Sequence, residues 1–318
     1  MKALIPVYII AGLLDSGKTS FIQSTLLEQD WIKEGGTLLL QCEEGEYELP
    51  ESVRLEKNLT LLPVKDPAQF TTGWCDEITD AFHPAQIIIE FNGMWDLKAF
   101  LQQDFTKQWG LAGIYSVADG SQLELVMNNM RNLFMNQHTE SDLIVVNRCR
   151  KDTKRVNFRK AIRLQNPAAQ IIFESENGEI IEFGEDDLPY DVKAPAFSIE
   201  DDDYGTWFAD ASEFPERYLR KKITFLCQTY RSLGMPRNIF VPGRRVMACC
   251  AADVQFYGFP CKSDSAVSCK NNSWHRITVE FTTEKRKDPR TGAPAKMPLL
   301  RLVSMEEAPA PEREVVTL

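Results

Sequence analysis

A glycine-rich segment near the start of the chain limits the possible folds more than any other feature. Residues 12–20 are GLLDSGKTS and fit the pattern G-x-x-x-x-G-K-[ST]. Residues 5–11 form a short apolar run rich in β-branched side chains, which predicts a buried strand. After the motif, apolar residues between Phe21 and Leu27 recur at helical spacing. A strand, a glycine loop and a helix in this order predict a phosphate-binding loop in an α/β protein.

The residue types of this loop match the chemistry of phosphate binding. Gly12 and Gly17 allow backbone conformations closed to residues with a Cβ atom, so that N–H groups and the helix N-terminus can face an anion closely. We expect Lys18 to bridge the β- and γ-phosphates of a nucleotide and the Thr19 hydroxyl to ligate Mg²⁺. The other loop residues expected at the nucleotide are Asp15, Ser16 and Ser20. The alternative is a glycine turn before an ordinary helix.

Composition limits the broad class of protein. The 318 residues suggest about two domains, and 43% hydrophobic with 26% charged residues is ordinary for a globular protein. The sequence has no run of 18 apolar residues, and its first apolar run leads directly into the glycine loop. We therefore expect neither a membrane span nor a signal peptide. The eight cysteines are then expected to be reduced and the protein to be cytoplasmic.

The net charge of −10 is concentrated in one segment. Residues 174–203 contain twelve Asp or Glu and a single lysine, Lys193. This segment predicts a solvated acidic connection and argues against a nucleic-acid surface there, but it says nothing about the rest of the chain. Nucleic acid is not among the expected partners.

The first half of the chain alternates apolar strands with amphipathic helices. The predicted strands are 5–11, 37–40, 59–64, 87–89, 113–117, 143–146 and 171–173. The predicted helices after the glycine loop are 67–82, 96–108, 121–136 and 152–165. This alternation predicts a mostly parallel sheet covered by helices on both faces.

The pattern changes in the second half. A short helical stretch near 212–221 precedes strand-like segments separated by Pro, Gly, Asn and Ser. These segments are 222–229, 238–241, 246–251, 276–282 and 299–303. They predict a small, mainly antiparallel β domain of barrel type. The predicted organisation is a P-loop nucleotide-binding domain (1–175), an acidic linker (176–203), a β-rich domain (204–305) and a flexible tail (306–318).

Two further segments supply acidic residues that suit a nucleotide site. Glu90 ends the apolar run 87–89, so a parallel sheet would deliver its carboxylate to the edge where phosphates bind, as a Mg²⁺ ligand, with the Gly93 N–H near the γ-phosphate. The alternative is a strand that ends in a surface charge. Glu43 and Glu46 follow the strand 37–40 in an acidic, glycine-containing loop and are candidate Mg²⁺ ligands. A solvated acidic turn is equally consistent with the sequence.

The order of these motifs resembles a known family. GLLDSGKTS, CEEGE, IIIEFNG, an aspartate after a strand (Asp119), VVNR and NPA follow one another as in the CobW/UreG/HypB branch of P-loop GTPases. The resemblance covers about residues 4–175. It implies a nucleotide-dependent metal chaperone or cofactor-insertion protein that serves a protein client. It also implies that Asn147 and Arg148 take the place of the Asn-Lys pair that reads guanine.

The chain departs from that family at two places. The family's base-recognition loop has Asp where this chain has Arg150, and Asp152 comes two residues later. GTP is the expected nucleotide by resemblance, and ATP remains an alternative. Many metal-handling members also carry a Cys-x-Cys-Cys cluster before the Glu90 strand, whereas residues 43–86 contain Cys75 alone.

The densest feature of the second half is the segment RRVMACCAAD, residues 244–253. With the surrounding residues 204–305 it resembles the soluble domain of an uncharacterised bacterial family found with predicted permeases, which implies an OB-like barrel and a permease-associated partner. Cys249 and Cys250 are candidate Zn²⁺ ligands, with Cys261, Cys269 and His275 nearby in sequence. Two small structural residues on opposite faces of a strand are the alternative. Residues 285–290 form a basic turn, which predicts a solvated hairpin tip. The alternative is a surface that meets RNA or the acidic surface of a partner.

These observations predict a P-loop NTPase, by resemblance a GTPase, with slow hydrolysis that depends on Lys18, Thr19 and Glu90. A regulatory or scaffold protein that binds nucleotide without hydrolysis is the rival prediction. An ATP-using relative is a third.

Overall fold

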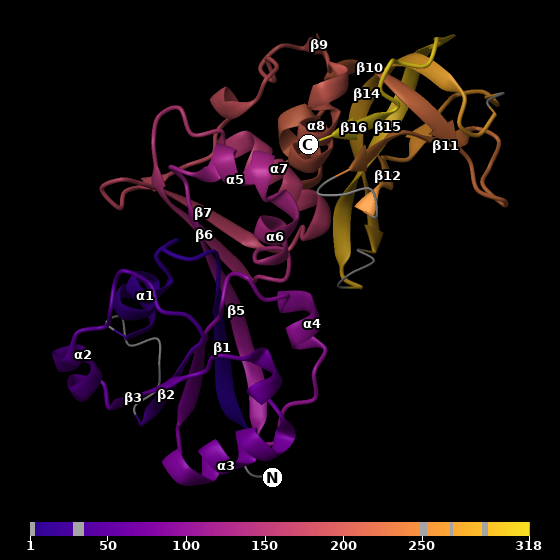
Figure 1. Ribbon diagram of the computed structural model, residues 1–318. Coiled ribbons are helices and arrows are strands. Elements are labelled where there is room, and N and C mark those ends of the chain that lie inside the picture. Colours follow the sequence, from indigo (N-terminus) through magenta and orange to yellow (C-terminus); the bar gives the residue numbers. More distant parts are fainter. Residues whose placement is uncertain (1–3, 28–34, 248–252, 268–269, 288–291, 318) are drawn as a thin grey trace. The chain divides into compact units, whose positions relative to one another are not determined.

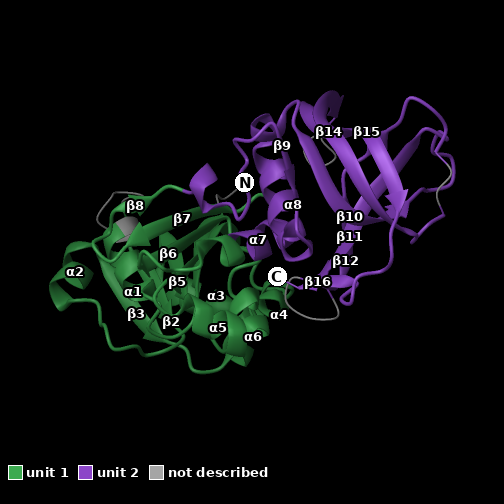
Figure 2. Ribbon diagram, turned by 90° about the horizontal axis from the view of Figure 1, so that it is seen from above, with its two compact units in different colours: residues 1–158, 168–182 green, residues 159–167, 183–318 purple. Residues whose placement is uncertain are grey.

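The chain forms two compact units in a computed structural model that describes residues 4–27, 35–247, 253–267, 270–287 and 292–317 (Figure 1). Unit 1 consists of Met1–Phe158 and Ala168–Glu182, and unit 2 of Arg159–Pro167 and Phe183–Leu318 (Figure 2). Residues 159–167 belong to unit 2, and the chain then returns to unit 1 for residues 168–182. From Phe183 onward it remains in unit 2.

Unit 1 contains an eight-stranded sheet with the order β3-β2-β4-β1-β5-β6-β7-β8. All neighbouring strands are parallel except β7 and β8. The strands are β1 (Ile5–Ala11), β2 (Thr37–Gln41), β3 (Leu59–Pro63), β4 (Gln86–Glu90), β5 (Trp109–Asp119), β6 (Leu143–Cys149), β7 (Gln170–Ser175) and β8 (Ile180–Ile181). The seven predicted strands and the mostly parallel sheet are confirmed, and unit 1 has the fold of a P-loop NTPase domain.

The helical segments are shorter than the sequence pattern predicts. They are α1 (Lys18–Phe21), η1 (Ile22–Leu27), α2 (Glu51–Glu56), η2 (Pro67–Gln69), α3 (Thr72–Phe82), α4 (Leu97–Leu101), α5 (Leu123–Asn129), α6 (Arg131–Asn136) and α7 (Arg155–Gln165). The predicted helix 67–82 is divided because Thr71 leaves the helix and its hydroxyl caps α3. The predicted helix 121–136 is divided at Met130, and 96–108 is helical only in α4.

Helices cover both faces of this sheet. On one face, alternate residues of β1, β2 and β4 such as Ile9 and Ile89 share a core with Cys75 of α3 and Phe100 of α4. On the other face, Ile10, Leu39 and Ile88 share a core with Phe21 and Ile22, which follow the glycine loop. Because β1 lies between β4 and β5, the loop after β1 lies beside the ends of both strands.

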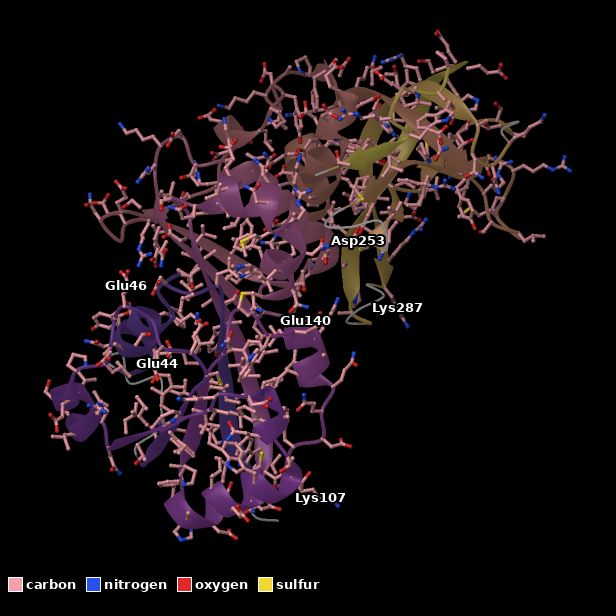
Figure 3. The ribbon with its side chains drawn as sticks, in the orientation of Figure 1. Glu44, Glu46, Lys107, Glu140, Asp253 and Lys287 are labelled. Atoms are coloured by element: carbon pink, nitrogen blue, oxygen red, sulfur yellow. The ribbon has the colours of Figure 1, made fainter. Side chains whose placement is uncertain are left out.

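Unit 2 contains the second sheet. Its strands are β9 (Ala196–Ser198), β10 (Lys222–Tyr230), β11 (Ile239–Met247), β12 (Gln255–Gly258), β13 (Cys261–Lys262), β14 (Trp274–Lys287), β15 (Pro294–Glu307) and β16 (Val315–Thr317). Its helical segments, besides the end of α7, are η3 (Glu185–Asp187), η4 (Asp201–Asp203), α8 (Tyr204–Glu213) and η5 (Pro215–Tyr218). The β14–β15 hairpin is the longest pairing, and Lys287 lies at its end (Figure 3).

Five of these strands close into a barrel. The pairings run β10-β11-β13-β15-β14 and return to β10. The pair β13–β15 is parallel and the other four are antiparallel. A five-stranded Greek-key barrel with this order is the OB-fold arrangement, so the predicted OB-like barrel is confirmed.

Helix α8 supplies large side chains to the barrel core. Trp207 is fully buried, and its ring lies 4.8 Å from that of Phe225 and 5.6 Å from that of Phe259, between ring centroids. Tyr204 is buried beside it. This apolar contact explains why a short helix precedes the first barrel strand.

Two segments differ from the sequence prediction. The acidic segment 176–203 contributes Leu188, Val192 and Ile199 to the core of unit 2, and its strand β9 pairs with β10. The sequence predicts a flexible tail at 306–318. Instead β15 continues to Glu307, and β16 pairs with β11 and buries Val316.

The predicted strands 238–241 and 246–251 are one strand, β11, up to Met247, and residues 248–252 lie outside the described residues. None of the helices in the described part of the chain combines the length and apolar character needed to cross a bilayer.

Candidate phosphate-binding site

The loop of residues 12–20 has the conformation that its glycines predict. Gly12, Asp15 and Gly17 have φ angles of 134°, 56° and 103°. A Cβ atom on Gly12 would lie 2.2 Å from the Val117 carbonyl oxygen, and one on Gly17 would lie 2.7 Å from Asn147 Nδ2. Both positions therefore require glycine, for its positive φ and for the close approach of neighbouring residues. This is more than a turn before an ordinary helix.

Lys18 folds back over the loop. Its ammonium group donates hydrogen bonds of 2.9 Å to the carbonyl oxygens of Gly12 and Leu13 and is also paired with the Glu43 carboxylate. The lysine is only 4% exposed. A buried cation held at the mouth of a loop of amides is the arrangement that binds phosphate.

Thr19 and Glu90 meet at the base of the site. The Thr19 hydroxyl donates to the Glu90 carboxylate, whose other oxygen accepts a 3.4 Å hydrogen bond from Gln41 Nε2. Glu90 is 2% exposed, so the alternative of a surface charge is wrong. Burial raises the pKa of Glu90, and the Glu43 charge adds to this effect, while the Thr19 hydrogen bond and Lys18 oppose it.

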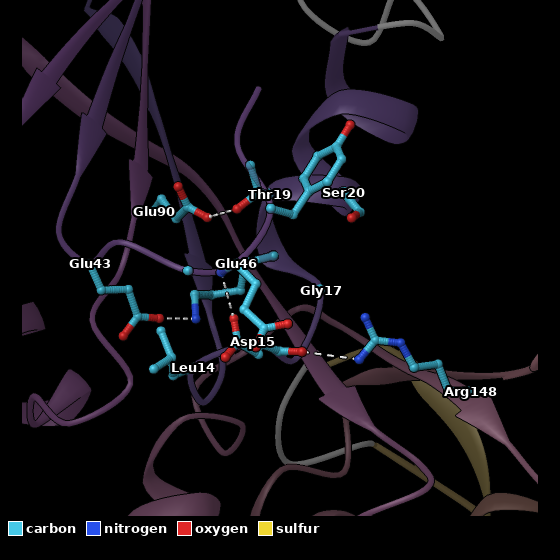
Figure 4. Close-up of a pocket in the computed structure, with 12 residues that line it drawn as sticks. Leu14, Asp15, Gly17, Thr19, Ser20, Glu43, Glu46, Glu90 and Arg148 are labelled. Atoms are coloured by element: carbon cyan, nitrogen blue, oxygen red, sulfur yellow. Dashed lines mark hydrogen bonds and ion pairs between the residues drawn. The ribbon is translucent and has the colours of Figure 1, made fainter. Parts of the chain in front are cut away.

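The loop after β2 closes over Lys18. Glu43 pairs with Lys18, and its second oxygen accepts a 3.1 Å hydrogen bond from the Gly93 N–H. Glu46 donates its own N–H to Asp15 Oδ1 at 3.0 Å, and its side chain is exposed. Of the two acidic residues in this loop that are predicted Mg²⁺ ligands, Glu43 therefore contacts Lys18 and Gly93, and Glu46 lies at the rim (Figure 4).

Asn147 and Arg148 approach the loop from the end of β6. Asn147 Nδ2 donates to the Ser16 carbonyl oxygen at 2.9 Å, and its Oδ1 is buried without a hydrogen-bond partner among the described residues. Arg148 bonds to the Asp15 carbonyl oxygen at 3.0 Å and to Asp119 Oδ2 at 2.8 Å. Burial opposes ionisation of Asp119, but hydrogen bonds from Ser121 and Arg148 outweigh it and hold the pKa of Asp119 below its usual value.

Arg150 stands where the family pattern has Asp. Arg150 pairs with Glu176 at 3.1 Å, and both side chains are largely exposed. Asp152 is exposed as well.

The phosphate loop and the segments that contact it border a cavity of about 290 Å³ (Figure 4). It is lined by Leu14, Asp15, Gly17, Lys18, Thr19, Ser20, Glu43, Gly45, Glu46, Tyr47, Glu90 and Arg148. Most of the residues predicted from the sequence thus line one cavity, and Gly12, Ser16, Gly93 and Asn147 contact its walls.

Sequence reasoning missed several residues at this site, besides Leu14 and Gly45 of the lining. Gln41 contacts Glu90, Tyr47 lines the cavity, and Gln137 Oε1 accepts a 3.4 Å hydrogen bond from the Gly12 N–H. Gln41 ends a strand adjacent to β4, so the strand order, once known, identifies it. No local pattern identifies Gln137, which lies far away in the sequence.

The cysteine site predicted in the second half is not described by the structure. Cys249 and Cys250 lie outside the described residues, as does Cys269. Cys261 and His275 are buried, and burial raises the pKa of Cys261 to about 12. Within the ranges that the structure describes, no three His, Cys, Asp or Glu side chains gather as a metal site.

Comparison with known proteins adds a family match for the second half. Residues 185–316 match the DUF1980 C-terminal domain. The DUF1980 match starts inside the acidic segment rather than at residue 204. It includes α8, the whole barrel and most of β16, which is consistent with the buried residues that the acidic segment gives to unit 2. A search of curated proteins gave no match.

The solved structures that are similar to the chain include the following two. The hydrogenase maturation factor HypB from Archaeoglobus fulgidus is 18% identical over 55% of this chain and 84% of that chain, with a TM-score of 0.35. A zinc-bound triple mutant of the YjiA GTPase is 15% identical over 76% of this chain and 86% of that chain, with a TM-score of 0.42.

Proposed function

We propose that unit 1 binds a nucleoside triphosphate at residues 12–20 and hydrolyses it slowly. The observation that carries this proposal is the conformation of the loop. Gly12 and Gly17 have positive φ, and the ammonium group of Lys18 is held over the loop by the loop's own carbonyl groups. A polyphosphate that enters the cavity meets main-chain N–H groups and a fixed positive charge.

The Thr19–Glu90 pair fits a magnesium ion. Both residues offer hard oxygen donors within hydrogen-bond distance of each other, and both are buried beside the cavity. Thr19 would hold the ion directly, and Glu90 directly or through water. When bound, Mg²⁺ neutralises charge on the β- and γ-phosphates.

The residues of this chain supply the remaining parts of phosphoryl transfer by position and charge. Lys18 stabilises negative charge on the transferred group, and the amides of the loop hold the β-phosphate. The Gly93 N–H is directed at the space above Lys18, where it can orient a terminal phosphate. Such a site suits slow turnover by a nucleotide-dependent switch.

The nucleotide is GTP by resemblance, with ATP as the alternative. Arg148 contacts the phosphate loop and Asp119, as a base-site cation would, but Arg150 places a cation where a guanine-reading carboxylate is expected. Calorimetric titration of GTP and ATP, each with and without Mg²⁺, distinguishes the two.

The task that we propose for the switch is delivery of a metal or metallocofactor to a protein client, or action on a permease-associated partner. The order of motifs over residues 4–175 supports the first of these. The candidate cargo ligands that the sequence offers are Cys249 and Cys250. Metal analysis of the purified protein and of a Cys249→Ser/Cys250→Ser variant tests this, and equal zinc content in the two would exclude the cysteine site.

Phosphate release tests the enzymatic part of the proposal. We expect Mg²⁺-dependent release by the wild type, loss of release in Lys18→Ala, and normal release in Lys107→Ala, which changes an exposed lysine elsewhere on unit 1 (Figure 3). Equal phosphate release by all three proteins would contradict the proposed hydrolysis. Nucleotide binding by the wild type without release would favour the non-hydrolysing regulatory or scaffold protein.

A further inference from the structure

Glu43 occupies an anion site with its own carboxylate. Its side chain is 10% exposed and that of Lys18 is 3% exposed, so the two charges are largely shielded from water. One carboxylate oxygen is paired with Lys18 Nζ, and the other accepts the 3.1 Å hydrogen bond from the Gly93 N–H. An ammonium group and a main-chain amide that converge on one carboxylate are the donors that a terminal phosphate uses in a loop of this kind.

The backbone on both sides of Glu43 is held in place. The Cys42 N–H donates to the Glu90 carbonyl oxygen at 3.0 Å, and Asn92 Nδ2 donates to the Cys42 carbonyl oxygen at 3.0 Å. On the other side, the Glu46 N–H is bonded to Asp15 Oδ1. The loop therefore directs Glu43 at Lys18 from two fixed points, one on the end of β4 and one on the phosphate loop.

The donor at Gly93 is equally fixed. A Cβ atom there would lie 2.7 Å from both the Gly12 carbonyl oxygen and the Leu13 Cα atom. The Gly93 amide thus lies against the phosphate loop itself, and its hydrogen bond is directed into the same space as Lys18. A carboxylate and a γ-phosphate cannot both occupy this space, because they would compete for the same donors and repel each other.

We propose that Glu43 is an internal substitute for the γ-phosphate, which a nucleoside triphosphate must displace and a diphosphate need not. This inference rests on the proposed function of unit 1, since it presumes that nucleotide binds at Lys18. Glu43 then sets the preference of the site between triphosphate and diphosphate.

Displacement of Glu43 also couples the type of bound nucleotide to the conformation of residues 42–47. With diphosphate bound, residues 42–47 keep the contacts described above. With triphosphate bound, Glu43 loses Lys18 and Gly93, and residues 43–45 rearrange between their two fixed points. The presence of the γ-phosphate thereby changes the conformation of the loop.

Affinity measurements on Glu43→Gln test this proposal. Isothermal titration in Mg²⁺ compares GTPγS with GDP, and ATPγS with ADP, for the wild type, Glu43→Gln and the control Glu44→Gln. Glu44 is the next residue and is exposed (Figure 3). Because hydrogen bonds to charged groups are stronger than those between neutral groups, we expect the triphosphate-to-diphosphate affinity ratio to rise about tenfold or more in Glu43→Gln and to stay unchanged in Glu44→Gln.

The possible outcomes separate this inference from the function on which it rests. If none of the three proteins (wild type, Glu43→Gln and Glu44→Gln) binds any nucleotide, the proposed function is wrong, and the inference is wrong with it. If the wild type binds but the ratio is the same in Glu43→Gln, the inference alone is wrong. A lower ratio in Glu43→Gln would make Glu43 a ligand of the Mg²⁺–triphosphate complex and would also overturn it. Glu43→Ala repeats the measurement if Glu43→Gln does not fold.

Discussion

Gly93 shows how closely two loops meet at the phosphate-binding cavity. Any side chain there would collide with backbone atoms of Gly12 and Leu13, which cannot rotate away. We therefore expect Gly93→Ala to lower the free energy of unfolding by about 1–3 kcal/mol, the usual cost of overpacking, and to weaken nucleotide binding by displacing the loop. Urea denaturation and nucleotide titration measure the two effects.

Gly73 provides the matched control for that substitution. It lies in the first turn of α3, and a Cβ atom there would meet nothing within 4 Å. Gly73→Ala should leave nucleotide binding unchanged and stabilise the protein by up to about 1 kcal/mol, because alanine favours the helix. Equal effects of the two substitutions would show that the contact at Gly93 is unimportant.

His138 predicts a pH dependence of stability. It is fully buried, its Nδ1 lies 2.8 Å from Ser116 Oγ, and its Nε2 has no partner among the described residues. Burial, with a smaller effect of Lys18, lowers the pKa of His138 from its ordinary value of 6.5 to about 3. Between these values the unfolded chain binds a proton that the folded protein does not, so stability decreases as pH falls.

The size of this effect can be measured by substitution. Between pH 7 and pH 5 we expect His138 to account for a loss of about 2 kcal/mol in the free energy of unfolding. Denaturant titrations at the two pH values should show a loss smaller by that amount in His138→Asn. The control His83→Asn changes an exposed histidine with φ of 46°, a conformation that asparagine accepts, and should keep the wild-type pH dependence.

The sequence pattern predicted those site residues whose position is determined by the end of the strand that precedes them. Lys18, Thr19 and Glu90 are of this kind, because the motif and the strand that precedes each residue determine where it lies. The contact between Glu43 and Lys18 is of another kind. It depends on how two loops meet across the edge of the sheet, and no pattern within either loop records that meeting. The same holds for Gln137, which reaches Gly12 from a distant helix end.

At the scale of elements, burial explains which strands the sequence reveals. Strands β2 and β4 in the middle of the unit 1 sheet are buried on both faces and therefore appear as continuous apolar runs. Strands β8, β9, β13 and β16 have two or three residues each, too few for a period to show. Closure of the barrel depends on the parallel pairing of β13 with β15, which brings together segments far apart in the chain.

Helix α8 carries Trp207, the largest of the fully buried side chains among the described residues. Trp207 contacts aromatic rings from α8, from β10 and from the segment before β13. Trp207→Ala should therefore lower the free energy of unfolding by about 3–5 kcal/mol, as removal of a large buried side chain does. Leu233→Ala, at an exposed leucine of the same unit, should change it by less than about 0.5 kcal/mol. Comparable midpoints of denaturation for the two variants would contradict this expectation.

At the scale of the whole molecule, the net charge of −10 conceals two opposite regions. Residues 174–203 carry a net charge of −11, whereas residues 220–305 contain sixteen Lys and Arg against five Asp and Glu, a net charge of +11. Within the described part of the barrel, Arg244 pairs with Asp201 and Arg286 with Glu284. Lys285 and Lys296 are exposed and face each other across the β14–β15 hairpin, where like charges repel.

Heparin chromatography tests whether the positive charge of residues 220–305 or the net charge of the whole chain determines binding to a polyanion. At pH 7.5 and low salt, a protein with a pI near 5.0 should pass through a heparin column, but the barrel predicts retention that salt reverses, because ions screen charges over about 10 Å at 0.1 M. Lys285→Ser/Lys287→Ser should elute at lower salt than the wild type. Lys98→Ser/Lys107→Ser, which removes the same charge from unit 1, should elute with the wild type. If the wild type flows through, the acidic segment neutralises the barrel in solution, and the two regions act as one weakly charged surface.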